Sequence, residues 1–161
     1  MGSRGSVVPY FKKMQKTGVL PITHPEMTRF SISLKEGVEM VLWALTNAHG
    51  GEIFVPKIPS YRITYIADAI GPDCEHKLTG IRPGEKLHEE MITSADAKNT
   101  VDLGCYYAIL APACELTVEN YCMQYGGKPV KSDFAYTSNT NPHFLSVKDL
   151  KDILLSADCS A

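Results

Sequence analysis

The chain has 161 residues, a formal net charge of −2 at pH 7, 44% hydrophobic residues and 21% charged residues. This length suits one domain with a buried core, and the composition is that of a soluble globular protein. The small negative charge argues against a general nucleic-acid or membrane-surface binder, because such proteins carry a basic excess. No apolar run approaches the ~20 residues of a membrane span.

The cysteines indicate a reducing compartment. They are odd in number and show no Cys-x-x-Cys spacing, which favours free thiols over a disulfide framework or a zinc site. The five are Cys74, Cys105, Cys114, Cys122 and Cys159. The N-terminus also has no apolar segment of a signal peptide, so we expect a cytoplasmic protein.

In chain order, the first expected elements are a helix over 7–16, with Gly18 after its end, and an extended segment over 19–22. Ser33 and Glu36 form a capping-box pattern that begins a second helix, reaching residue 49. Its apolar side chains recur at helical spacing and predict one face packed in the core: Leu34, Val38, Val41, Leu42 and Leu45.

The later elements alternate between strands and helices, without repeats or low-complexity tracts. Strands are expected over 52–55, 77–81 and 106–110, and helices over 64–70 and 146–155. Ser146 and Asp149 repeat the capping pattern at the start of the last helix. The fold class is therefore mixed α/β, in a single domain over 1–161.

A turn between the second and third strands carries the strongest chemical signal. Residues 80–90 read Gly-Ile-Arg-Pro-Gly-Glu-Lys-Leu-His-Glu-Glu, and the Pro-Gly pair sets Arg82 and Glu85 in a defined relation. A guanidinium suits a phosphate or pyrophosphate, and a carboxylate can accept two sugar hydroxyls. The alternative is a surface turn whose Arg and Glu pair with each other.

Four motifs occur in one order along the chain. They are Gly-Ser-Arg-Gly-Ser-Val-Val-Pro at 2–9, Met-Thr-Arg-Phe at 27–30, Gly-Gly-Glu-Ile-Phe-Val-Pro-Lys-Ile-Pro-Ser at 50–60 and Arg-Pro-Gly-Glu-Lys-Leu-His-Glu-Glu at 82–90. This series resembles the C-terminal, substrate-binding half of inverting UDP-N-acetylglucosamine 4,6-dehydratases. These enzymes belong to the extended short-chain dehydrogenase/reductase superfamily and act in flagellin-glycan and capsule-sugar synthesis.

The chain departs from that family in two ways. It has no Gly-rich turn between a strand and a helix, where such enzymes bind the NADP pyrophosphate. It also lacks their catalytic Tyr-x-x-x-Lys pair, since Tyr125 is followed by Lys128 one position too early. We therefore expect a truncated or split chain without the N-terminal Rossmann half, with no catalytic residues and no NADP bound by this chain alone.

The resemblance implies roles for individual residues. Arg29 and Arg82 would hold the nucleotide diphosphate, and Glu85 the ribose hydroxyls, although a lone Arg29 is more often a surface ion-pairing residue. The nucleobase would lie between the start of the first helix and the extended segment, at Val8, Pro9, Leu20, Pro21 and Ile22. For Val8 and Ile22, a place in the core has equal weight. Arg4 would touch substrate or a subunit interface, and His88 is interpreted as structural rather than as a metal ligand.

The full enzyme's reaction, as the resemblance implies it, is a redox-assisted loss of water that inverts C5 and gives a 4-keto-6-deoxy sugar. This chain would contribute binding of the UDP-sugar, either with a complementary N-terminal Rossmann chain or as a non-catalytic nucleotide-sugar-binding or interaction module. An incomplete gene model explains the same pattern. Without the other half, an apolar surface would be exposed, and we expect a homo-oligomer.

Overall fold

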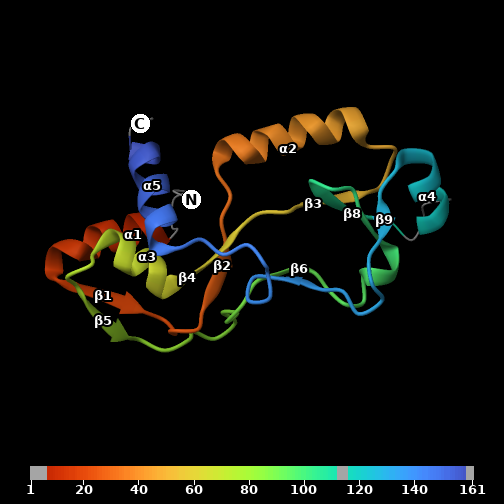
Figure 1. The fold of residues 1–161 in the computed structure, drawn as a ribbon. Coiled ribbons are helices and arrows are strands. Elements are labelled where there is room, and N and C mark those ends of the chain that lie inside the picture. The colour runs from red at the N-terminus through yellow and green to blue at the C-terminus, as the bar shows by residue number, and fades with distance from the viewer. Residues whose placement is uncertain (1–6, 112–115, 159–161) are drawn as a thin grey trace. The chain divides into compact units, whose positions relative to one another are not determined.

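The computed structural model describes residues 7–111 and 116–158. Two compact units interleave along the chain. Unit 1 takes Met1–Ile32, Pro59–Glu89 and Ser138–Ala161, and unit 2 takes Ser33–Ile58 and Glu90–Thr137, insofar as these segments are described. The elements of both units are labelled in Figure 1. The single domain over 1–161 stays a prediction.

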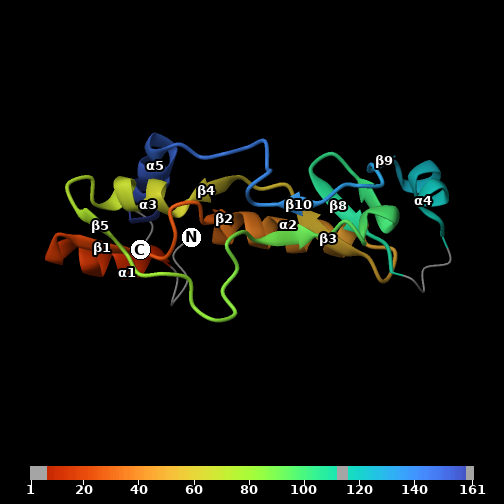
Figure 2. The same ribbon diagram turned by 90° about the horizontal axis from the view of Figure 1, so that it is seen from below.

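Unit 1 combines three helices with two pairs of strands. Strand β1 runs parallel to β5, and β2 runs antiparallel to β4. Helices α1 and α3 lie beside β1, and α5 packs against α3 (Figures 1 and 2). The bounds are α1 Val7–Met14, η1 Gln15–Thr17, β1 Val19–Ile22, β2 Thr28–Phe30, β4 Ser60–Arg62, α3 Ile63–Ile70, β5 Glu75–Leu78 and α5 Val147–Asp158.

The core of unit 1 is built from alternate residues of β1 and from the inward faces of the helices. Leu20 and Ile22 are fully buried, as are Ile66 of α3 and Leu150 of α5, and Phe11 of α1 is 1% exposed. Alternation along a strand then directs the intervening residues of β1 away from this core. The core therefore fixes which residues of β1 remain available to a ligand.

Unit 2 is built on a four-stranded antiparallel sheet of order β3-β8-β7-β9, with a second strand pair formed by β6 and β10. Trp43 of α2 packs against Phe54 and Tyr106 on two of its strands, with ring centroids 5.1 and 4.4 Å away. The bounds are α2 Leu34–Asn47, β3 Ile53–Pro56, β6 Glu90–Ile92, η2 Ala97–Asn99, β7 Thr100–Asp102, β8 Tyr106–Ile109, α4 Val118–Tyr125, β9 Lys128–Pro129 and β10 Tyr136–Thr137.

Local sequence signals explain where the helices begin and end. The Ser33–Glu36 capping box is formed in full at the start of α2, with the Ser33 amide donating to the Glu36 carboxylate over 2.7 Å. Ser146 and Asp149 make the corresponding contacts before α5. Gly18, with φ of 74°, ends the first helical segment and turns the chain into β1. These elements confirm the sequence predictions.

Two predictions about packing and position are wrong. The apolar stripe of α2 does not lie in the core, because every member is exposed: Leu34 84%, Val38 49%, Val41 59%, Leu42 58% and Leu45 76%. The strand expected over 77–81 lies earlier, at Glu75–Leu78, because it follows the register of its pairing with Val19–Ile22. Residues 79 and 80 instead enter the turn that carries Arg82.

Candidate functional site

A pocket of about 760 Å³ lies in unit 1, a volume typical of small-ligand sites. Apolar and aromatic side chains come from α1, β1, β2, β4 and the start of α3, while polar and charged side chains come from β2, Thr23 and the turn after β5. The lining residues are Val7, Tyr10, Phe11, Pro21, Thr23, Met27, Arg29, Phe30, Tyr61, Ile63, Thr79, Gly80, Arg82 and Glu85. The pocket thus combines apolar surface with charged side chains.

The turn that carries Arg82 is closed by its own main chain. The Glu85 amide donates to the Arg82 carbonyl over 3.0 Å, and the Arg82 amide donates to the Glu85 carboxylate over 3.2 Å. Gly84, with φ of 81°, supplies the left-handed conformation that the turn requires. Glu85 therefore binds the main chain of Arg82, and within the described part of the chain the exposed Arg82 guanidinium forms no ion pair with it.

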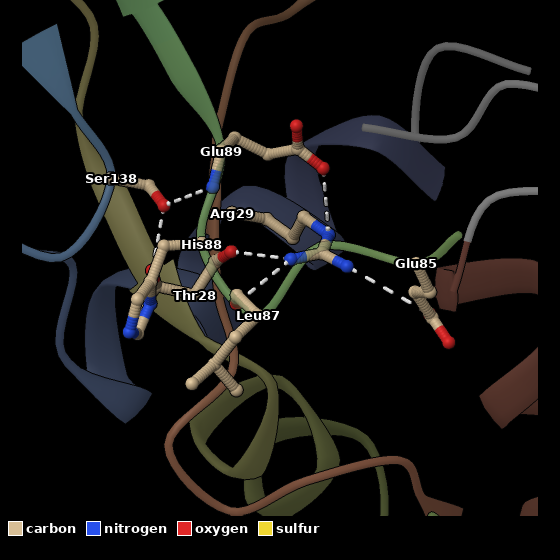
Figure 3. Close-up of polar contacts among 7 residues, drawn as sticks. All are labelled: Thr28, Arg29, Glu85, Leu87, His88, Glu89 and Ser138. Atoms are coloured by element: carbon tan, nitrogen blue, oxygen red, sulfur yellow. Dashed lines mark hydrogen bonds and ion pairs between the residues drawn. The ribbon is translucent and has the colours of Figure 1, made fainter. Parts of the chain in front are cut away.

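Arg29 is held in a different way (Figure 3). Its Nη1 donates to the carbonyls of Thr28 and Leu87, at 2.7 and 3.2 Å. Its Nε lies 3.4 Å from a carboxylate oxygen of Glu89, and its Nη2 lies 3.8 Å from one of Glu85. Arg29 thus links β2 to the segment that follows the turn, and its side chain is 20% exposed.

Behind Arg29, three side chains form a hydrogen-bonded chain (Figure 3). The Glu89 amide donates to the Ser138 hydroxyl over 2.9 Å, that hydroxyl lies 2.6 Å from the Thr28 hydroxyl, and the latter lies 2.8 Å from Nδ1 of His88. One consistent proton order runs from Glu89 through both hydroxyls to His88, which then accepts at Nδ1. This chain supports the structural interpretation of His88.

Tyr61 places a phenol at the pocket wall with its ring 6% exposed. Burial raises the pKa of this phenol, and the charge of Arg29 opposes the rise. The phenol is protonated at neutral pH, so its hydroxyl can donate a hydrogen bond to a ligand. In residues 7–111 and 116–158, no three His, Cys, Asp or Glu side chains come together to hold a metal ion.

Residues 1–111 match the family model described as "Polysaccharide biosynthesis protein". The chain belongs to this family. A Campylobacter jejuni relative named "UDP-N-acetylglucosamine 4,6-dehydratase (inverting)" is 48% identical over 161 residues, which cover 96% of this chain and 48% of the relative. A Rickettsia typhi relative named "UDP-glucose 4-epimerase" is 39% identical over 163 residues, which cover 98% of this chain and 47% of the relative.

A solved structure, "X-ray structure of Pen from Bacillus thuringiensis", superposes with a TM-score of 0.81 at 26% identity, over 98% of this chain and 48% of that one. The resemblance to inverting dehydratases and the α/β fold are therefore confirmed. The chain spans about half the length of the curated relatives it matches. No helix among the described residues is both long and apolar enough to cross a membrane.

Within this family member, the pocket brings together four of the residues expected at the site: Arg29, Arg82, Glu85 and Pro21. The side chains of the other described candidates do not line it. Val8, Leu20 and Ile22 are buried in the core of unit 1, and Pro9 is exposed outside the pocket. Arg4 lies outside the described residues.

Sequence reasoning missed Glu89, Thr28 and Ser138. Thr28 and Ser138 are 110 residues apart, so no local pattern could pair them. Glu89 stands inside the recognised motif, but its contact with Arg29 depends on how β2 lies beside residue 87. The available signal was chemical, because an arginine in a partly buried place needs carboxylate partners.

The described residues do not fit the pyrophosphate of NADP. The chain's two glycine pairs, Gly50-Gly51 and Gly126-Gly127, each follow a helix and precede a strand. A dinucleotide site needs the reverse order, a strand followed by a glycine turn and a helix N-terminus whose amides face the phosphates. Gly126 is the C-cap of α4, with φ of 85°, and Gly50-Gly51 follows the C-cap of α2, which is Ala48.

Proposed function

We propose that this chain is the UDP-sugar-binding part of a nucleotide-sugar 4,6-dehydratase, and that the unit 1 pocket holds the nucleoside diphosphate. The observation that carries this proposal is the meeting of Arg29, Arg82 and Glu85 in one pocket whose lining also includes apolar and aromatic side chains. The two relatives supply a second argument. Their names give different reactions but the same UDP group on the sugar, and this half is similar in both.

The role of each residue in binding the UDP group follows from the chemistry of its side chain. Arg82 offers an exposed fork of donors to the pyrophosphate, and Arg29 completes the cationic side. Glu85, fixed by the main chain of the turn, accepts from ribose hydroxyls. The nucleobase lies at the apolar lining residues Tyr10, Phe11 and Pro21, with main-chain groups near Val8, Pro9, Leu20 and Ile22 reading its edge.

The chain's contribution to the reaction is binding and orientation. Fixing the UDP group positions the sugar ring, and such positioning supplies about 7–11 kcal/mol of barrier lowering in favourable cases. The hydride chemistry of NADP belongs, in this proposal, to the remaining half of a full-length enzyme, so no proton or hydride step is assigned to the described residues. Taken alone, the chain binds substrate without converting it.

The partner in this proposal is a complementary Rossmann-type chain, and the exposed stripe of α2 supports it. A row of five exposed apolar side chains on one helix is the type of surface that a second polypeptide covers. Without that partner, the chain covers the stripe by homo-oligomerisation. Cys74, Cys105 and Cys122 are free thiols, which suits a cytoplasmic protein.

The decisive experiment is calorimetric titration of the purified chain with UDP-N-acetylglucosamine, alongside Arg82→Ala. We expect saturable binding that Arg82→Ala weakens about tenfold or more, because a charge-assisted contact to phosphate is lost. Arg62→Ala is the control, since Arg62 lies in the same unit and pairs with Glu26 outside the pocket. It should bind as the unaltered chain does.

One further titration and one activity assay distinguish a dehydratase part from a non-catalytic nucleotide-sugar-binding module. UDP-glucose tests whether the pocket recognises the UDP group common to both relatives, in which case its affinity will resemble that of UDP-N-acetylglucosamine. Adding a separately expressed Rossmann half of a relative tests the dehydratase assignment through formation of the keto sugar. Binding without restored turnover would favour the non-catalytic module, and a folded chain that binds neither ligand would contradict the proposed function.

A further inference from the structure

The guanidinium of Arg29 has one edge set by the main chain and one edge facing carboxylates. Nη1 is held by the carbonyls of Thr28 and Leu87. The orientation of the group is therefore fixed, and its Nε and Nη2 atoms form the remaining edge. These two parallel donors are the ones that take a phosphate in a bidentate manner.

Two carboxylates now occupy that edge. An oxygen of Glu89 lies 3.4 Å from Nε, and an oxygen of Glu85 lies 3.8 Å from Nη2 (Figure 3). Charge-assisted hydrogen bonds are shorter, at about 2.7–2.9 Å. Both contacts are thus ion pairs without a short hydrogen bond, and an incoming phosphate oxygen can form a better contact with either donor.

The two carboxylates are not held equally. Glu85 is fixed by the Arg82 amide, and its side chain is 30% exposed. The Glu89 side chain is 43% exposed, and within residues 7–111 and 116–158 its one contact is the ion pair with Arg29, whereas its main-chain amide is anchored by donating to Ser138. The Glu89 side chain can therefore turn into water while its backbone stays in place, whereas movement of the Glu85 carboxylate also breaks its hydrogen bond with the Arg82 amide.

We propose that Glu89 is a displaceable counter-ion of Arg29 that sets the affinity of the pocket for the diphosphate. This inference rests on the proposed function. In the free protein Glu89 neutralises Arg29 and keeps its edge occupied, and on binding the diphosphate takes both donors while the Glu89 carboxylate moves into solvent. The exchange reduces the net electrostatic gain from binding, and a ligand without phosphates does not take part in it.

The test is to titrate the chain and its Glu89→Gln variant with UDP and with uridine. Removing the carboxylate charge leaves Arg29 without its exchangeable partner, so we expect UDP to bind about tenfold more tightly. Uridine should bind equally to both proteins. The gain for UDP should shrink at about 0.5 M NaCl, where exposed charges are screened.

Two additional variants complete the design. Glu75→Gln removes the same charge from an exposed position on β5 and should leave UDP affinity unchanged. Glu89→Asp shortens the side chain by one methylene and should give an intermediate gain, which keeps the test available if Glu89→Gln folds poorly.

Unchanged or weaker UDP binding by the Glu89 variants would overturn the inference, as would an equal gain for uridine. If the unaltered chain binds UDP and Arg82→Ala weakens it, this failure concerns Glu89 alone. If the folded, unaltered chain does not bind UDP at all, the proposed function fails and the inference fails with it.

Discussion

Two buried hydroxyl groups connect the strand that carries Arg29 to the segment that carries Glu89. Thr28 and Ser138 are 3% and 0% exposed, and together they connect β2 to the amide of Glu89. Buried hydroxyls of this kind stabilise a fold only when each has a partner, because an unpaired polar group retains its desolvation penalty. Of the residues in this network, Ser138 should therefore lower the free energy of unfolding most when it is replaced.

We predict that Ser138→Ala lowers the free energy of unfolding by about 1–3 kcal/mol, since the Glu89 amide and the Thr28 hydroxyl both lose a partner. Urea denaturation followed by circular dichroism measures the change. Ser156→Ala removes an exposed hydroxyl from α5 and should change the value by less than about 0.5 kcal/mol. Equal effects from both variants would contradict the importance of the network.

At the residue scale, contacts between neighbours in one turn could be predicted from the sequence, and contacts between residues far apart in the chain could not. Arg82 and Glu85 are three residues apart, so a Pro-Gly turn was enough to place them together. Arg29 could be recognised as an anion-binding candidate, but its pairing with Glu89 spans sixty positions. Such a pairing depends on how the segment around residue 87 lies beside β2, where the Thr28 amide donates to the Leu87 carbonyl over 3.1 Å, and a local sequence pattern does not encode this contact.

Among the elements, α2 has a carboxyl group in its N-terminal cap, so the stability of its first turn depends on pH. The Ser33 amide donates to the Glu36 carboxylate, and this hydrogen bond is the main reason that the pKa of Glu36 lies below its usual value of 4.5. A carboxyl with a lowered folded-state pKa stabilises the fold above its unfolded-state pKa. That stabilisation is lost as the pH falls through the folded-state pKa.

We predict that Glu36→Gln reduces the pH dependence of stability below about pH 4.5, because the variant has no proton to take up at the helix start. The measurement is the difference in urea midpoint between the two proteins from pH 7 to pH 3, which should narrow as the pH falls. Glu39→Gln on the same helix removes an exposed carboxyl paired with Lys35 and serves as the control. A difference that stays constant with pH would contradict the prediction.

Elements whose own sequence contains capping residues and a hydrophobic period could be predicted. Elements that form only by pairing with a distant segment could not. Helix α2 has a capping box at its start and apolar residues that recur at helical spacing. Strands β2 and β4 are three residues each, and they exist because residues 28–30 pair with residues 60–62. Helix α4 was missed because its N-cap, Thr117, precedes a segment with only one buried side chain, Tyr121, so no apolar face marks it.

For the whole molecule, the relevant feature is the stripe of exposed apolar side chains on α2. The helical period was correctly recognised from the sequence, but whether its apolar face is covered depends on what lies next to it. Water-exposed leucines and valines in a row favour association, since each buried CH₂ contributes about 0.8 kcal/mol. The isolated chain should therefore self-associate through this face.

We predict that replacing Leu42 and Leu45 by Lys shifts the purified chain toward the monomer in size-exclusion chromatography with light scattering, without loss of helical signal. Both side chains are more than half exposed, so the change introduces no buried charge. Thr46→Lys adds charge at an exposed position of α2 outside the stripe and should leave the oligomeric state unchanged. A monomeric unaltered chain would contradict the prediction.

The interleaving of the two units has a consequence for synthesis on the ribosome. Unit 2 needs only residues between 33 and 137, whereas unit 1 also needs α5, whose Leu150 and Leu154 complete the core behind α3. The segments of unit 1 that precede α5 must therefore wait for it, and pairings between distant segments form slowly. The sheet of unit 2 can assemble before α5 has been made, whereas the core of unit 1, which shares Phe11 and Ile63 with the pocket lining, is complete only afterwards.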